Sequence, residues 1–333
     1  MIQFGNGGFV VSLPRSWVAK NNLKKGDMLT IREEADQLTF SMDHTDQKKE
    51  ETRITIEVTG KKISRIKSEI VSAYLNNYHV IELIAKNKME NPLEIKHLLR
   101  DLAGMEIMEQ TSTKLVAKDL INIQDISIDN IIRQIDNIIR GMTEDCVKCI
   151  KGDDHYESIF QRDLDVNRLF YLCIRVIKGG LKNLGFAKIL KRENSELALD
   201  WLVLVRLEKI ADRQKRIARA LLNVKLSDSS ADDLERLYLG IREAYCGVMK
   251  AYYTFDKDAA YDIEIANAVT INNCTEFLRK NTGCMLVNSK QGAVKKSPKI
   301  EKSNCVHIAR IVENMNAMST SIKYIARRVM DRW

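Results

Sequence analysis

Residues 195–223 read SELALDWLVLVRLEKIADRQKRIARALLN, and this stretch decides the fold class. It contains neither Gly nor Pro, the two residues that interrupt helices most strongly. Its apolar side chains recur at the three- and four-residue spacing of a single helix face. The stripe consists of Val203, Leu207, Ile210, Ile217 and Leu221. The stretch therefore predicts one long helix that buries this face against neighbouring helices.

The same period continues from about residue 126 to the end of the chain. We expect helices over residues 127–151, 154–184, 195–223, 229–254, 257–287 and 301–331. Polar turns separate them at residues 152–154, 192–194, 226–228 and 291–298. Long helices joined by short turns pack antiparallel. Residues 126–333 are therefore predicted to form two tandem three-helix units, over about 126–224 and 228–333.

Residues 1–45 carry a different pattern, which predicts a small β-rich module. A short apolar strand precedes Pro14, a short helix follows over residues 15–21, and two alternating stretches near residues 29–31 and 38–40 indicate a hairpin. A module this small, without a disulfide or metal, rarely buries its own apolar face. We therefore expect an interleaved homodimer through this module.

Between these parts, residues 43–52 form a polar linker and residues 53–120 predict a small α+β subdomain. Strands are expected near residues 54–58, 80–84, 105–109 and 114–118, with helices over about 63–74 and 93–102. The segment contains neither a Gly-rich phosphate loop nor a catalytic constellation. The predicted fold class is thus mainly α, with two small β-containing parts in front of the helices.

Composition limits the class of protein further. The chain has 333 residues, enough for two or three domains, and seven Cys without regular spacing, which disfavours a disulfide framework and favours a reducing compartment. The formal net charge of +8 permits an anionic partner without selecting one. No apolar stretch reaches membrane-spanning length and no signal peptide is evident, so we expect a cytoplasmic protein.

Two stretches of the N-terminal module carry a family resemblance. Residues 12–18, SLPRSWV, followed by LKKGD at 23–27, resemble the S-L-P-K/R-x-W and L-x-x-G-D pattern of the AbrB/SpoVT swapped-hairpin domain. The resemblance implies dimerisation by hairpin exchange, and many members of that family bind DNA.

Two helical stretches carry a second resemblance. RDLDVNRLF at residues 162–170 and LEKIADR at 207–213 resemble the R-D-x-E-V-D-R-L-Y and L-E-R-I-A-D-H patterns of the PhoU family. The order of the three parts resembles the archaeal branch of that family. The resemblance implies a negative regulator of phosphate uptake that couples a phosphate ABC transporter to a sensor kinase.

The PhoU resemblance also implies a metal cluster held by acidic pairs. Glu208 and Asp212, and likewise Asp163 and Asn167, lie four residues apart and so share a helix face. Oxygen ligands on adjacent helices can hold a divalent or an iron- or zinc-type ion. Asn167 stands where the family pattern has a carboxylate, and the alternative is a set of surface ion pairs with nearby arginines.

Candidate DNA-binding residues lie in the N-terminal module. They are Arg15, Lys20, Lys24 and Lys25. Phosphate contacts require clustered cations, and a dimer can place Arg15, Lys24 and Lys25 on one face. The alternative is that the module serves dimerisation alone.

Two functions remain open at this stage. The first is a regulator of phosphate uptake that works as a dimer through protein partners. The second is a transcriptional regulator that uses the N-terminal module on DNA and the helical part as its sensor. No nucleophile–base pair or cofactor fingerprint is evident, so we do not expect an enzyme.

Overall fold

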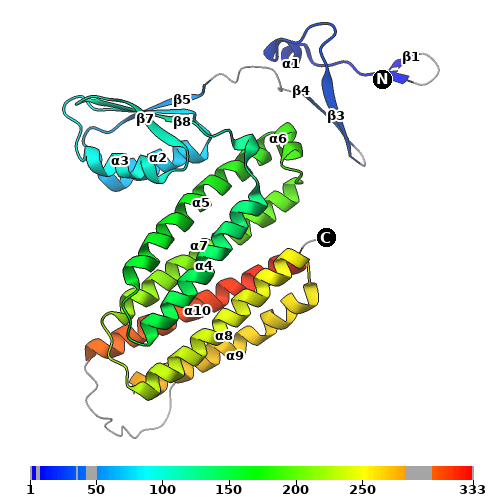
Figure 1. The fold of residues 1–333 in the computed structure, drawn as a ribbon. Helices are drawn as coiled ribbons and strands as arrows, with labels where there is room; N and C mark the ends of the chain where they lie inside the picture. Colours follow the sequence, from blue (N-terminus) through cyan, green and yellow to red (C-terminus); the bar gives the residue numbers. More distant parts are fainter. Residues whose placement is uncertain (1, 5–7, 35–36, 43–50, 283–301, 332–333) are drawn as a thin grey trace, which may run out of the picture. The chain divides into compact units, whose positions relative to one another are not determined.

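A computed structural model describes residues 2–4, 8–34, 37–42, 51–282 and 302–331. The chain forms two compact units, Met1–Lys49 and Glu50–Trp333. The first is small and β-rich, and the second is dominated by long helices (Figure 1). The predicted linker at 43–52 and the loop around 291–298 lie almost entirely outside the described residues.

The N-terminal unit consists of two strand pairs and one short helix. Strands β1 (Ile2–Phe4) and β2 (Gly8–Val10) pair antiparallel, as do β3 (Leu29–Glu34) and β4 (Gln37–Met42). Helix α1 (Arg15–Lys20) lies between the pairs in sequence. The predicted hairpin and helix are confirmed, but β2 ends at Val10 rather than continuing toward Pro14.

The LKKGD stretch at residues 23–27 forms a tight turn that needs both its Gly and its Asp. Gly26 has a φ of +101°, a conformation that side-chain-bearing residues rarely adopt. The Asp27 carboxylate accepts a hydrogen bond of 2.6 Å from the backbone N–H of Lys24, which closes the turn.

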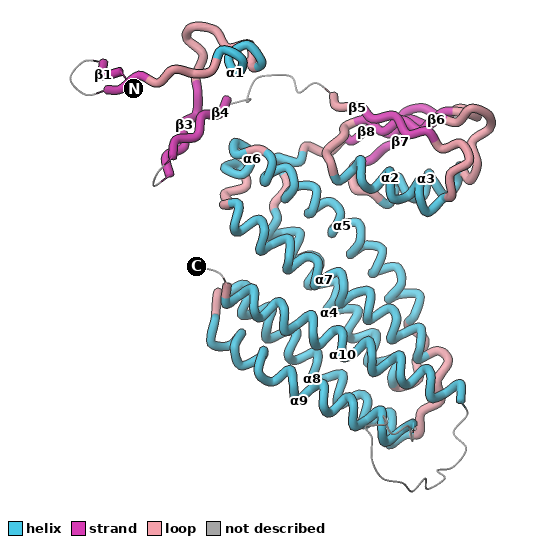
Figure 2. Tube along the Cα trace, turned by 180° about the vertical axis from the view of Figure 1, so that it is seen from behind, coloured by secondary structure: helices cyan, strands magenta, loops and turns pink. Residues whose placement is uncertain are grey.

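The α+β segment begins the second unit with a four-stranded mixed sheet. Its elements are β5 (Arg53–Glu57), α2 (Ile63–Leu75), β6 (Val80–Ile84), α3 (Pro92–Asp101), β7 (Met105–Gln110) and β8 (Lys114–Asp119). The strand order is β5-β6-β8-β7, with only β5 and β6 parallel. Both helices cover the same face of the sheet (Figure 2), and side chains such as Ile70, Leu83 and Leu99 are fully buried between these layers.

Seven helices come next in the described part of the chain, preceded by a short 3₁₀ turn at Ile123–Asp125. They are α4 (Ile128–Ile150), α5 (Tyr156–Lys182), α6 (Leu184–Ile189), α7 (Asn194–Leu221), α8 (Asp228–Thr254), α9 (Lys257–Thr282) and α10 (Lys302–Met330). The six long helices confirm the predicted segments, while residues 283–287 lie outside the described part. Ser127 and Ser227 cap α4 and α8 by accepting backbone N–H bonds.

One short helix, α6, is missing from the prediction. Its start is set by Asn183, whose backbone is extended and whose side chain accepts a bond of 3.1 Å from Phe186 N. This cap separates α6 from α5, although the two helices are almost continuous in sequence.

The long helices pack in two groups of three that share one core. Helices α4, α5 and α7 contact one another, as do α8, α9 and α10. The groups meet extensively along α7 and α10, and also where α4 contacts α8, and a single buried apolar cluster runs through all of them. The two predicted three-helix units are therefore not separate cores.

Buried tyrosine–carboxylate bonds lie where the two groups meet. Asp136 on α4 accepts bonds from the hydroxyls of Tyr245 (2.8 Å) and Tyr253 (3.1 Å) on α8. Asp200 on α7 accepts a bond of 2.8 Å from Tyr252. Burial and the neighbouring Asp136 charge raise the pKa of Tyr245, so its hydroxyl stays a donor.

A buried ion pair fixes the sheet to the helices. The guanidinium of Arg175 on α5 pairs with Asp119 at the end of β8, and both side chains are about 1% exposed. Arg175 Nε also donates 2.8 Å to Asn77 Oδ1, and the guanidinium lies 4.6 Å from the centre of the Tyr74 ring. The α+β segment, predicted as a subdomain of its own, therefore belongs to the same compact unit as the helices.

No helix in the described part of the chain has the length and apolar character needed to span a membrane.

Breaking the Arg175–Asp119 pair is expected to destabilise the second unit strongly. Asp119→Ala leaves a buried guanidinium without its counter-charge, which costs about 3–5 kcal/mol of unfolding free energy. Urea unfolding followed by far-ultraviolet circular dichroism measures the decrease. The double variant Arg175→Met/Asp119→Leu should be destabilised less than Asp119→Ala, because no charge is left unpaired.

The matched control is Lys86→Ala, which removes an exposed pair with Glu57 and should cost less than about 1 kcal/mol. A destabilisation by Asp119→Ala no larger than that of the control contradicts the role given to the buried pair.

Candidate functional site

The structure brings the four predicted metal ligands onto two facing helices. Asp163 and Asn167 lie on α5, and Glu208 and Asp212 lie on α7. Asp163 is buried, at 2% exposure, and accepts a hydrogen bond of 3.3 Å from Asn167 Nδ2. The i, i+4 spacing therefore places each pair as expected, at the edge of the α5–α7 contact.

A lysine that the sequence analysis did not single out lies between these carboxylates. Lys215 Nζ is 2.5 Å from Asp163 Oδ2 and 3.3 Å from Asp212 Oδ1. Arg216 Nε forms an ion pair with the second oxygen of Asp212, Oδ2, at 2.8 Å. Burial disfavours the charge of Lys215, but the hydrogen bond and charge of Asp163 outweigh it and raise its pKa. The protein thus supplies its own cation here.

Glu208 occupies a different environment from Asp212. Its nearest cation is Lys209, with Nζ 3.5 Å from Oε2. Burial raises the pKa of Glu208, and the charges of Asp212 and Asp163 raise it further. An added cation beside this carboxyl group would therefore offset both its burial and the two neighbouring charges.

Within the described residues, no group of three or more His, Cys, Asp or Glu is arranged to hold a metal ion. The contacts at Asp163 and Asp212 fit an ammonium group better than a metal. A divalent or iron- or zinc-type ion at these oxygens stays a prediction, and it would have to displace Lys215 Nζ.

The four candidate DNA-binding residues lie together in the N-terminal unit. Arg15 and Lys20 are on α1, and Lys24 and Lys25 are in the turn after it. All four side chains are exposed, and none forms an ion pair with another described residue. A shallow hollow of about 500 Å³ lies beside Arg15 and Lys24.

Cys146 and Cys149 form a C-x-x-C stretch in the sequence, and both pack within the helical core from α4. Cys146 and Cys149 are both buried free thiols, and Cys146 Sγ lies 3.6 Å from the Gln214 carbonyl oxygen. Burial raises the pKa of both thiols, which disfavours the thiolate that metals require.

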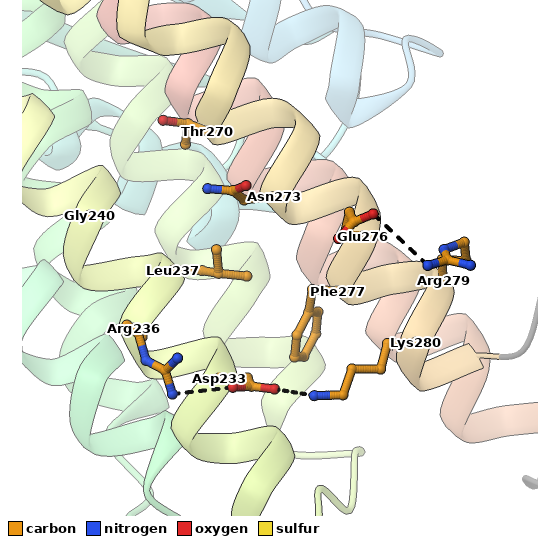
Figure 3. Close-up of a pocket in the computed structure, with 10 residues that line it drawn as sticks. All are labelled: Asp233, Arg236, Leu237, Gly240, Thr270, Asn273, Glu276, Phe277, Arg279 and Lys280. Atoms are coloured by element: carbon orange, nitrogen blue, oxygen red, sulfur yellow. Dashed lines mark hydrogen bonds and ion pairs between the residues drawn. The ribbon is translucent and has the colours of Figure 1, made fainter.

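A groove of about 450 Å³ runs between α8 and α9. Asp233 lies at its end between Arg236 (3.2 Å) and Lys280 (2.6 Å), as Figure 3 shows. The hydrogen bond from Lys280 and the charges of both cations lower the pKa of Asp233. Glu276 is similarly close to Arg279, at 3.9 Å. The lining has three cations, Arg236, Arg279 and Lys280, and the two carboxylates pair with them, so only a small positive excess is left to attract a ligand.

A second cleft, between α7 and α10, was not anticipated. Its lining includes four arginines and one acidic residue, Glu313. The spacing of Arg213, Arg216 and Arg219 at i, i+3 and i+6 was a visible signal on one side, but the partner residues on α10 are about a hundred positions away. Only the antiparallel packing of the two helices brings them together.

Comparisons of the chain with protein-family models, with curated proteins and with solved structures find no match.

Removing the internal cation is expected to create affinity for a divalent ion. Lys215→Met frees the oxygens of Asp163 and Asp212, so Mn²⁺ should bind the variant about tenfold or more tighter than the original protein. Isothermal titration calorimetry measures the difference. Lys182→Met is the matched control, since it removes an exposed lysine at the end of α5 that contacts none of the four candidate ligands in the described structure. Equal Mn²⁺ affinity in all three proteins would show that Lys215 does not occupy a cation site.

Proposed function

We propose that this protein is a dimeric regulator of phosphate uptake that acts through protein partners rather than by catalysis. The observation that carries the proposal is the N-terminal unit, which leaves its apolar side chains uncovered. Two further features support it: an apolar face on α9, and the PhoU-like stretches at residues 162–170 and 207–213.

The N-terminal unit has no buried side chain among its described residues 10–40. Met28 is 85% exposed, and Ile31 and Leu38 of the β3–β4 hairpin are more than half exposed. Both described sheets of this unit have only two strands, so their outer edges can accept another strand. A second copy of the same chain supplies both the apolar cover and the strand edges.

The outer face of α9 is suited to a protein partner. Tyr261, Ile265 and Val269 follow one another at four-residue spacing, and each is more than half exposed. Contiguous exposed apolar residues on a helix commonly mark a contact surface for an amphipathic helix of a partner. A transporter subunit or a sensor kinase, the partners implied by the PhoU resemblance, is the class of protein we propose for this face.

Dimerisation is expected to depend on the N-terminal hairpin. The protein should sediment as a dimer at micromolar concentration, whereas Ile31→Glu/Leu38→Glu should shift it toward monomer, because the charges cannot be buried in the interface. Analytical ultracentrifugation distinguishes the two. Leu93→Glu is the control, since Leu93 is 68% exposed on α3 and belongs to the other unit. A monomeric original protein, or an unchanged dimer in the hairpin variant, overturns the proposed dimer.

The exposed cations of the N-terminal unit favour DNA binding as the second candidate function. A dimer doubles the set formed by Arg15, Lys20, Lys24 and Lys25, and unpaired cations of this kind supply phosphate contacts.

If this second function holds, the protein binds a duplex from its own upstream region with an affinity that falls steeply as salt rises. Arg15→Ala/Lys25→Ala should reduce the slope of log K against log salt by about 0.9 for each phosphate that the variant no longer neutralises. Fluorescence anisotropy at several salt concentrations measures this slope. Lys67→Ala/Lys88→Ala removes two exposed lysines from the α+β segment and should leave the slope unchanged. Absence of binding at low salt removes the DNA-binding function.

A further inference from the structure

The cleft between α7 and α10 carries a larger excess of positive charge than the α8–α9 groove, because its four arginines face one carboxylate, whereas the three cations of the groove face two. The helices run antiparallel there, since Lys225 contacts Asn304 near one end and Arg206 lies over the Tyr324 ring near the other. The cleft measures about 360 Å³, within the range of small-molecule sites. It is lined by Arg213, Arg216, Arg219, Ala220, Asn223, His307, Arg310, Glu313 and Asn314.

Three of the arginines are held in place by neighbours that leave part of each guanidinium available. Arg213 Nη1 donates to Asn314 at 3.1 Å, and Arg216 uses Nε toward Asp212. Arg219 donates through Nε and Nη2 to the Tyr156 hydroxyl, at 3.0 and 2.6 Å. Each therefore keeps further N–H donors, because a guanidinium carries five. Groups positioned in this way bind a ligand without first having to be ordered.

Two lining groups have unmet bonding capacity. The side chain of Arg310 is exposed and forms no ion pair or hydrogen bond with another described residue. Nδ1 of His307 is buried, and within the described structure it has no hydrogen-bond partner. Since Nδ1 of His307 is closed to solvent, Arg310 is the lining residue whose N–H donors are open to a ligand.

The space itself comes from a small residue at the helix contact. Ala220 is 5% exposed and lies one turn beyond Arg216 on the same face of α7. Its methyl group leaves room where a longer side chain would fill the gap between the helices. Four arginines face one acidic residue, Glu313, so the lining keeps a positive excess even when His307 is neutral.

We propose that this cleft binds a small phosphorylated anion through its phosphoryl oxygens. Guanidinium groups match phosphate because each donates two parallel N–H bonds to an oxygen pair. Arg213 and Arg219 are six residues apart, which is about 9 Å along the helix axis. Donors spread over that length, with Arg310 opposite them on α10, can contact several oxygens at once. They therefore suit a polyvalent anion better than a ligand that carries a single carboxylate.

The chemistry is shared by free orthophosphate and by small molecules that carry a diphosphate, and both belong to this proposal. In the proposed regulator, on which this role rests, such an anion is the effector that the helical unit senses. The cleft lies wholly in the second unit, so its binding does not require the dimer. A monomeric protein would therefore contradict the proposed dimer without contradicting anion binding in the cleft, and a cleft that binds no anion would leave the dimer unaffected.

Isothermal titration of the full-length protein with orthophosphate, with pyrophosphate and with sulfate tests the inference. Binding of one or both phosphates tighter than about 1 mM, and tighter than sulfate, is expected. The tighter of the two identifies the source. Arg310→Ala should weaken that binding about tenfold or more, because it removes charge-assisted hydrogen bonds without removing an internal partner.

The matched control is Arg236→Ala, which deletes an exposed arginine from the α8–α9 groove and should leave the affinity unchanged. Circular dichroism of both variants verifies that the helices are intact. The proposal is overturned if neither phosphate binds, if sulfate binds equally well, or if Arg236→Ala weakens binding as much as Arg310→Ala.

Discussion

The buried guanidinium of Arg175 is the constraint on which the rest of the second unit depends. It lies on α5, pairs with Asp119 at the end of β8, and bonds to Asn77 after α2, so a sheet and a helix bundle that have separate apolar cores become one body. Its Nη1 atom has no hydrogen-bond partner within the described structure. A buried ion pair rarely adds net stability compared with apolar residues, but it tolerates only one arrangement of its partners. The pair therefore fixes the position of α5, against which α7 presents its acidic cluster.

Helix α7 carries two charged faces that differ in their balance of positive and negative side chains. Toward α5, carboxylates and cations neutralise one another, with Lys215 between Asp163 and Asp212. Toward α10, the arginines outnumber the acidic groups, and Arg310 is left without a partner among the described residues. Arg216 lies at the boundary, since it pairs with Asp212 and also lines the cleft. The same residue thus links an internally satisfied cluster to an unsatisfied one.

The fold was largely predictable because the pattern that specifies each long helix is local. The stripe through Val203, Leu207 and Ile210 is buried as expected, and the polar turns lie where α4, α7 and α8 end or begin. The features that were missed are long-range or conformational: Asn183 caps a helix that no period revealed, and Lys215 and the α7–α10 cleft depend on which helices meet. Residues four apart can be placed on one face from sequence alone, whereas pairs such as Arg213 and Asn314 require the tertiary arrangement.

No side chain is buried in the described N-terminal residues 10–40, so the stability of this unit depends on how much of the protein a cell contains. In the proposed dimer, the apolar side chains of this unit are covered only when two copies meet, so its stability depends on protomer concentration. At low abundance the unit spends more time open and is accessible to proteases. Gene dosage and synthesis rate then act as regulatory inputs in their own right, because they set how many copies keep an intact N-terminal unit.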